Sequence, residues 1–364
     1  MTAVRGRHPS PPQIPLFDHA VRLHGDTPDK PLERGGVPLP DQDLHRVRSQ
    51  ARKSSGWRRK SAEAARILDQ HFARPGSSPP DLARSFHGLD VHGPREHISA
   101  AALRADEQRV SRTGRWLVRH GTDRCAVFVG LRLLANTISP EDVELLKMIG
   151  LLREFGPEAA EALTRRGAIT ALKWLAERTT EQTRLRAVEG VMRMDKSFEH
   201  KWLLRRGLGR DEMSRYLAGD LATQAHLHEA IVRADVPDWL VDETGWFLAT
   251  MTGAHGVGVV LENYPPGDLV AAAHVRHLSS RKTTKERYYT AAATCAYIHQ
   301  TDALSRSWSP DARAAVVEAY IAVLARREWV ETAHALLRSG HHLAAALTRA
   351  VPGELSAKLG WQNP

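Results

Sequence analysis

The sequence predicts an all-α protein in which short helices stack in pairs as an irregular α-solenoid, preceded by a disordered N-terminal tail rich in proline and arginine. From residue 97 onward, apolar residues recur at three and four positions, the spacing that gives a helix one apolar face. Glycine, proline or Ser-Pro separates these segments, and GVGVVLENY at 256–264 is the only hint of a strand. Because each segment is too short to be stable by itself, it must bury its apolar face against a neighbour.

Length and composition restrict the class of protein without identifying its function. A chain of 364 residues is long enough for two average domains or for one repeat array. No run approaches the roughly 18 apolar residues of a membrane span, and MTAVRGRHPSPPQIP lacks the apolar core of a secretory signal. We therefore expect a cytoplasmic protein without a membrane span. Cys125 and Cys295 lie in apolar helical contexts, so we interpret both as small buried side chains.

The chain is expected to contain three segments. Residues 1–60 hold 12 lysines and arginines against 6 acids, and residues 1–40 hold eight of the twenty prolines, so we expect 1–60 to be a disordered basic tail. Residues 61–96 are expected to form a short helix and a linker, broken by RPGSSPPD at 74–81. Residues 97–364 are expected to form one all-α helical-repeat domain.

A basic stretch at residues 46–60 carries seven cations, no acid and Trp57. Because cations grip a phosphate backbone and an indole stacks on a base, one interpretation is a contact with nucleic acid. The other interpretation is a solvated basic linker. The net charge of +9 is concentrated at this end of the chain, which directs a nucleic-acid hypothesis to the tail rather than to the helical body.

Helix starts are marked most clearly at Ser139 and Ser309. Each serine precedes a proline and an acid, so the serine can cap the helix, the proline suits the first turn, and the acid suits the positive helix end. The segment RKTTKERYY at 281–289 allows two interpretations. It either contacts a phosphodiester backbone through its four cations or begins a helix at one of its threonines and buries its tyrosines.

A Trp-Leu pair recurs in RWLVRHG, KWLAERT, KWLLRRG and WLVDETG, with tryptophans at 116, 174, 202 and 239. Charged residues surround each pair, and Gly121 and Gly207 follow two of them. Glycine just past the last turn commonly adopts the left-handed conformation that closes a helix, and cations there meet the negative end of the helix dipole. We therefore interpret the motif mainly as the closing turn of a helix, with both glycines left-handed.

Two of these copies place like charges four residues apart on one helical face, Arg115 with Arg119 and Lys201 with Arg205. Such a pair costs roughly a few tenths of a kcal/mol in an isolated helix. One interpretation is that these four cations bind an anion or a partner. The alternative is that acids of neighbouring helices, such as Glu141, neutralise them.

The motifs of catalysis and cofactor binding are missing. The sequence contains no GxSxG elbow, no Walker-type loop and no ordered GxGxxG fingerprint, so it identifies no catalytic or cofactor-binding residue. His226 and His228 are two apart and are expected on different sides of a helix, whereas His274 and His277 are three apart and can share a face. The latter two are the candidates for a metal site, although we expect no bound metal.

The strings GTDRCAVFVGLRLLA, DVELLKMIGLLREFG, EALTRRG and ALKWLAERT resemble the HEAT and armadillo class of α-solenoid repeats, over about residues 97–350. More narrowly, the central part resembles a group of HEAT-like bacterial proteins, one of which is named a limonene hydroxylase. The first resemblance implies stacked helix pairs. The second implies a monooxygenase that uses NADH and oxygen to convert the monoterpene limonene into perillyl alcohol and carveol.

Three functions follow as expectations. The first is a non-enzymatic scaffold whose concave surface binds a protein or peptide partner, since stacked helix pairs present extended faces. The second is the limonene-type monooxygenase, which rests on resemblance without a cofactor motif. The third is a nucleic-acid-binding protein similar to the HEAT-type alkylpurine DNA glycosylases, or one that binds nucleic acid through residues 46–60.

Overall fold

The computed structural model confirms an all-α protein. It describes residues 14–51, 56–89, 91, 96–194, 200–252, 258–300, 307–339 and 355, and none of these lies in a strand. The strand suggested by GVGVVLENY is therefore not found in its described part, which contains the 3₁₀ helix η5 (Leu261–Asn263). Through the same ranges, no helix combines the length and the apolar character needed to cross a membrane.

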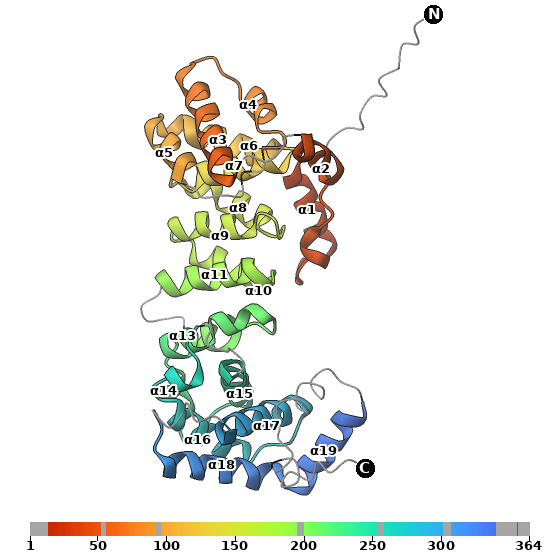
Figure 1. Ribbon diagram of the computed structural model, residues 1–364, viewed down its shortest axis with the longest axis vertical. Helices are drawn as coiled ribbons and strands as arrows, with labels where there is room; N and C mark the ends of the chain where they lie inside the picture. The colour runs from red at the N-terminus through yellow and green to blue at the C-terminus, as the bar shows by residue number, and fades with distance from the viewer. Residues whose placement is uncertain are drawn as a thin grey trace, which may run out of the picture. The chain divides into compact units, whose positions relative to one another are not determined.

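The chain divides into two compact units, residues 1–194 and residues 195–364. Their boundary falls inside the segment 97–364 that the sequence suggested as one domain. Unit 1 contains α1 (Leu16–Asp26), η1 (Glu33–Gly36), α2 (Gln42–Ala51), α3 (Trp57–Ala73), α4 (Pro79–Ser85), α5 (Glu96–Arg104), α6 (Glu107–His120), α7 (Arg124–Leu134), η2 (Pro140–Asp142), α8 (Val143–Gly150), α9 (Gly156–Arg165), α10 (Ile169–Glu177) and α11 (Glu181–Met194) (Figure 1).

Unit 2 is also helical throughout its described part. It contains α12 (His200–Trp202), η3 (Leu203–Gly207), η4 (Glu212–Tyr216), α13 (Ala218–Gln224), α14 (Leu227–Ile231), α15 (Asp238–Thr252), η5, α16 (Gly267–Leu278), α17 (Lys285–Gln300), α18 (Pro310–Leu324) and α19 (Arg327–Arg338). η3 is a π-helical turn, whereas η1, η2, η4 and η5 are 3₁₀ helices.

Within each unit, helices contact both the next helix and the next but one. In unit 1, α6, α8 and α10 contact one another in sequence, as do α7, α9 and α11 (Figure 1). In unit 2, the corresponding series are α13, α15, α17 and α19, and α14, α16 and α18. Each short helix therefore has neighbours in its own series and in the other series, which supplies the burial that its length requires.

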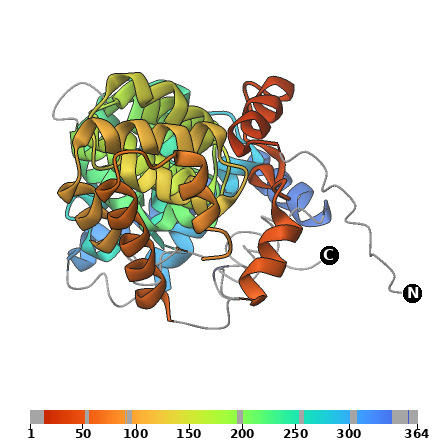
Figure 2. The same cartoon turned by 90° about the horizontal axis from the view of Figure 1, so that it is seen from above.

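The expectation of a disordered tail is wrong for the residues described between 14 and 60. α1 packs on α6 and α8, Leu16 is buried, and its amide donates to the Gly121 carbonyl at 2.9 Å. Figures 1 and 2 both show α1, in red, beside the yellow helices of unit 1. Two of the described prolines flank a helix rather than interrupt it, since Pro15 precedes α1 and Pro28 follows it. Residues 1–13 lie outside the described residues.

The basic stretch 46–60 is likewise helical where it is described, in α2 and at the start of α3. Arg46 pairs with Asp43 at 3.0 Å, and Arg48 pairs with the buried Asp123 at 3.2 Å. Part of the positive charge of this stretch is therefore paired with acidic residues of unit 1. The side chain of Trp57 and residues 52–55 lie outside the described residues.

The predicted helix starts are confirmed in part. The Ser309 hydroxyl accepts from the Ala312 amide at 3.1 Å, as predicted, and Thr284 accepts from the Arg287 amide at 3.1 Å. Tyr288 in the same segment is fully buried, which confirms the helical interpretation of RKTTKERYY, whereas Tyr289 is only half-buried. Ser139 stands at the predicted cap position but makes no capping bond; the Arg115 guanidinium donates to its hydroxyl at 3.4 Å instead.

The Trp-Leu motif closes helices differently from the prediction. Gly121 follows α6 with φ −66°, so it is not left-handed, and Gly207 lies inside the π-helical turn without a positive φ. Gly121 instead allows close packing, because an added Cβ would lie 2.7 Å from Val127. In all four copies the leucine is buried, while the tryptophan is half-buried at the edge of the core.

A glycine pair lies where α6 and α7 of unit 1 cross. Gly114 of α6 faces Gly130 of α7, and a Cβ on Gly130 would lie 2.8 Å from the Leu117 Cβ and 3.0 Å from the Gly114 carbonyl oxygen. Distances of that size require backbone movement, so the two helices depend on glycine to approach each other.

We predict that Gly130→Ala lowers the free energy of unfolding by about 1 to 2 kcal/mol, because overpacking outweighs the gain in helix propensity. Gly25→Ala in α1 is the matched control, since nothing lies within 4 Å of its added Cβ. Chemical unfolding followed by circular dichroism would measure both. Equal stability of the two variants would contradict the proposed close crossing.

Candidate functional site

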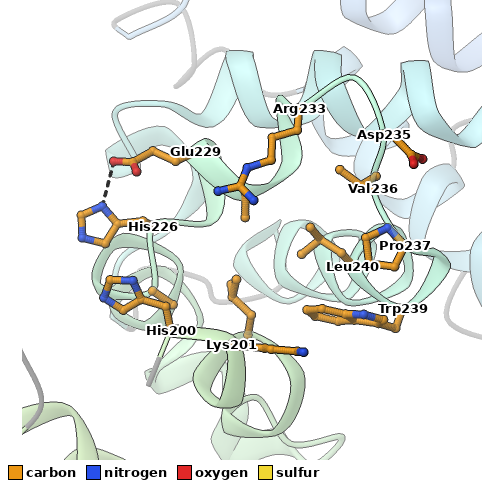
Figure 3. A pocket seen from close by; sticks show the side chains of 13 residues that line it. His200, Lys201, His226, Glu229, Arg233, Asp235, Val236, Pro237, Trp239 and Leu240 are labelled. Atoms are coloured by element: carbon orange, nitrogen blue, oxygen red, sulfur yellow. Dashed lines mark hydrogen bonds and ion pairs between the residues drawn. The ribbon is translucent and has the colours of Figure 1, made fainter. Parts of the chain in front are cut away.

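A cavity of about 350 Å³ in unit 2 is the candidate functional site (Figure 3). It lies between α12 with η3, the ends of α13 and α14, and the start of α15. The lining residues are His200, Lys201, Leu204, Ala225, His226, Glu229, Ala230, Arg233, Asp235, Val236, Pro237, Trp239 and Leu240.

One wall is positioned by the start of α15. Pro237 precedes this helix, and Asp238 in its first turn pairs with Arg287 at 2.9 Å and with Arg281 at 3.3 Å. The hydrogen bond from Arg287 and the nearby charges lower the pKa of Asp238, so this carboxylate stays ionised. This anchor places Trp239 and Leu240 along the cavity.

The opposite wall contains the π-helical turn η3, which continues directly from α12. Such turns occur mostly as single insertions and often at functional sites. Leu203 and Leu204 are buried, whereas Lys201 and Arg205 are exposed. The Arg205 guanidinium lies 5.7 Å from the centroid of the Trp239 ring, so it contacts the indole beside the cavity.

Histidines and one carboxylate form a third edge. His226 adopts a left-handed backbone with φ 52° immediately before α14, and its Nδ1 lies 2.9 Å from Glu229 Oε1. The ring of His200 is 4.7 Å from that of His226 between centroids, and His228 Nε2 lies 3.7 Å from the same Glu229 oxygen. The hydrogen bond with His226 lowers the pKa of Glu229.

This geometry corrects the expectation for HLHE. Two residues two apart on a regular helix diverge by about 200°, but His226 lies before the helix and has a left-handed backbone. Both histidines therefore approach the same carboxylate. Histidine is among the residues enriched in this conformation, which is sparsely populated for most side chains.

The cavity combines an apolar floor with unpaired positive charge. Leu204, Val236 and Leu240 are buried at its base. In Figure 3, Arg233 reaches toward the cavity from one side and Lys201 from the other, with Leu240 and Trp239 beside them. Neither cation forms an ion pair with a residue that the structure describes. The arrangement suits a ligand that presents an anionic group next to an apolar group.

The four cations predicted to bind an anion are divided between the two units. Lys201 lines the cavity and Arg205 lies beside it. Arg115 instead pairs with the fully buried Asp142 at 2.6 Å and with Glu141 at 3.2 Å, and Arg119 pairs with Asp18. These two arginines hold helices of unit 1 together, so of the predicted set only Lys201 lines the cavity and only Arg205 lies next to it.

The two histidines considered for metal binding are core residues. His274 is 1% exposed, and its Nδ1 lies 2.7 Å from the Tyr320 hydroxyl. Burial lowers the pKa of His274 to about 3. His277 Nε2 lies 3.0 Å from the Ile231 carbonyl oxygen, which accepts its hydrogen bond. Both histidines are therefore engaged by protein partners.

A different polar cluster joins α2 to the start of α7. Asp41, His45 and Asp123 place ligand atoms within 4.8 Å of one another, the spacing of a metal site. Both carboxylates, however, already meet arginines: Asp41 accepts from Arg124 at 2.9 Å and Asp123 from Arg48 at 3.2 Å. These guanidinium groups oppose the binding of another cation, so we interpret the cluster as a buried junction.

Both cysteines are buried and free. Cys125 lies at the edge of this junction, with its Sγ 3.7 Å from His45 Nδ1. Burial raises the pKa of Cys295 to about 12, so its thiol stays protonated in the core. The sequence prediction of small buried side chains is confirmed for both, although Cys125 also has a polar neighbour.

Arg233 and His200 line the cavity but were not among the residues predicted from the sequence. The signal that could have identified them was the density of histidine and arginine between residues 200 and 233, close to Trp202 and Trp239. Comparisons with protein-family models, curated proteins and solved structures gave no match. The chemistry of the cavity is therefore the basis for the functional proposal.

His274 generates a prediction about stability at low pH. Because its folded pKa is about 3 and its unfolded pKa about 6.5, only the unfolded chain gains this proton between those values. Stability contributed by the neutral form is present above about pH 6.5 and is lost as the pH falls, by at most about 1.4 kcal/mol per pH unit.

We predict that His274→Gln flattens the fall of unfolding free energy between pH 6.5 and 4. Urea unfolding at several pH values would measure the slope, with His299→Gln, at an exposed position, as the control substitution. An unaltered slope in His274→Gln would contradict a lowered pKa of His274 in the folded protein.

Proposed function

We propose that the protein is a helical-repeat binding protein, and that the cavity of unit 2 receives an anionic group of a peptide or protein partner. The observation that carries this proposal is the pair Lys201 and Arg233, two cations without an ion pair among the described residues, placed around an apolar floor. A charge-assisted hydrogen bond is worth roughly 1.5–3 kcal/mol, about twice a neutral one.

The packing within each unit supports a repeat architecture. Contacts between alternate helices generate two series in each unit, as expected when helix pairs of the HEAT or armadillo kind stack on one another. Such proteins bind partners through the surfaces that their stacked helices create. A partner-binding role therefore agrees with the packing and with the chemistry of the cavity.

The cavity gives less support to the limonene alternative. A hydrocarbon placed there would remove Lys201 and Arg233 from water without offering either a partner. A second hollow, between α16 and α18, has about 360 Å³ and is mostly apolar, with Ala272, Val275, Ala315 and Ala319 in its lining. A terpene would suit this hollow better, and monooxygenase activity there would additionally require NADH, oxygen and a redox cofactor. We keep that activity as the second candidate.

Nucleic-acid binding through residues 46–60 is also less well supported than binding of an anionic peptide group. Arg46 and Arg48 already pair with acids of unit 1, which reduces the charge that this stretch offers to phosphates. The cavity also contains Glu229 and Asp235, which would repel a polyanion. A single anionic group on a peptide is compatible with both carboxylates.

To test the proposal, the immobilised full-length protein would be exposed to a library of random octapeptides, and the retained peptides would be identified by mass spectrometry. We predict retention of peptides that combine an anionic group with apolar residues. The double variant Lys201→Glu/Arg233→Glu should retain about 10-fold less, because it replaces attraction by repulsion.

Lys285→Glu is the matched control, since Lys285 is exposed and lies outside the cavity lining. It should retain the same peptides as the wild type. If the double variant also retained them unchanged, with its melting temperature intact, the cavity would not be the binding site.

A further inference from the structure

We infer that the group received by the cavity is the free C-terminal carboxylate of a peptide chain whose last side chain is apolar. This inference rests on the proposed function and specifies its ligand. Any occupant has two requirements to meet, because the buried lining side chains Leu204, Val236 and Leu240 need apolar contact and the cations Lys201 and Arg233 need an anion.

The size of the cavity limits the occupant to a small part of a partner. At about 350 Å³ it lies near the lower end of the usual range for ligand sites, roughly 300–1,000 Å³. A helix of about 10 Å diameter could not enter it. The apolar and anionic groups of the occupant must therefore lie within a residue or two of each other.

A chain terminus meets this requirement more simply than an internal acidic residue. At a C-terminal residue, the carboxylate and the side chain diverge from one Cα atom, so the side chain can reach the floor while the carboxylate meets the cations. At an internal Asp or Glu, the peptide main chain continues in both directions from the residue. Its N–H and C=O groups would then lie against Val236, Trp239 and Leu240 without hydrogen-bond partners. From a C-terminal residue, the main chain continues in one direction only.

The cations suit a carboxylate in geometry as well as in charge. The planar guanidinium of Arg233 can donate two parallel hydrogen bonds to one carboxylate, and Lys201 supplies a second positive charge from the other side. Trp239 offers a flat face to the apolar side chain. Glu229 forms a hydrogen bond with His226 at 2.9 Å, so its carboxylate is directed toward this histidine.

Asp235 determines the orientation in which a peptide is expected to bind. Figure 3 shows it at the Val236 and Pro237 end of the cavity, away from His200 and His226. A carboxylate bound near Asp235 would be repelled, so the terminal group is expected between Arg233 and Lys201. The rest of the peptide would then leave the cavity beside Asp235. The negative charge of Asp235 favours a basic side chain in the peptide, upstream of its last residue.

The experiment compares three octapeptide libraries that differ in one group: a free C-terminus, a C-terminal amide, and a C-terminal amide with an internal phosphotyrosine. Each is offered to the full-length wild-type protein, to Arg233→Gln and to the control Lys285→Gln. We expect the free acids to be retained about 10-fold more than the amides, with apolar last residues enriched. Arg233→Gln should lose this preference, and Lys285→Gln should keep it.

Several results would overturn the inference. Equal retention of acids and amides, abolished by Lys201→Glu/Arg233→Glu, would leave the proposed function standing and exclude the terminal carboxylate as the determinant. Stronger retention of the phosphotyrosine library would assign the cavity to a phosphorylated side chain. Retention of none of the libraries would contradict the proposed function together with the inference. Thermal melting of each variant would exclude unfolding as the cause.

Discussion

The structure depends on the mutual burial of helices, most of which are too short to be stable individually. α10 has 9 residues and α16 has 12, and isolated helices below roughly 12–15 residues are marginal in water. Each therefore relies on neighbours in its own series and in the other series of its unit. The Trp-Leu motif reflects this constraint, because its leucine enters the core while its tryptophan remains at the edge beside charged groups. Trp174 illustrates the arrangement. The Lys147 Nζ atom lies 4.8 Å and the Arg178 Cζ atom 4.7 Å from the centroid of its ring.

The same packing determines which arginines are buried in ion pairs and which remain exposed to solvent. In unit 1, Arg124 and Arg166 are nearly buried and meet the buried carboxylates of Asp41 and Asp142. Removing one member of such a pair leaves an uncompensated charge, so these arginines serve the fold. At the cavity of unit 2, Lys201 and Arg233 remain exposed to solvent and carry no burial penalty. Their charge is available to a ligand for that reason.

Much of the fold could be predicted from local chemistry. The 3.6-residue periodicity identified the all-α class, and the cap at Ser309 and the start of α17 followed from residues adjacent in sequence. The errors arose where distant contacts decide the outcome. Prolines suggested disorder before residue 60, yet Pro15 and Pro28 flank α1, which packs on α6 and α8. Gly121 was expected to be left-handed, but close packing against Val127 explains it better.

The site was less predictable for the same reason. Lys201 and Arg205 were recognised from their spacing, whereas Arg233 and His200 enter the cavity only because the start of α15 and the left-handed His226 bring separate segments together. Like-charge spacing also could not distinguish Lys201 from Arg115, whose partners Asp142 and Glu141 lie in η2 of unit 1. The pattern of charges identified candidates, and tertiary contacts showed which of them form an ion pair with a described residue.

Carboxylate binding in the cavity is measured most directly by the nuclear magnetic resonance signals of the Trp239 indole N–H and the Arg233 Nε–H, each assigned by substitution. These signals would be followed in the full-length protein during titration with N-acetylleucine and, separately, with N-acetylleucinamide. We expect both signals to shift and saturate with the carboxylate and to shift far less with the amide. Unchanged signals with the carboxylate, or equal shifts with the two compounds, would contradict this expectation.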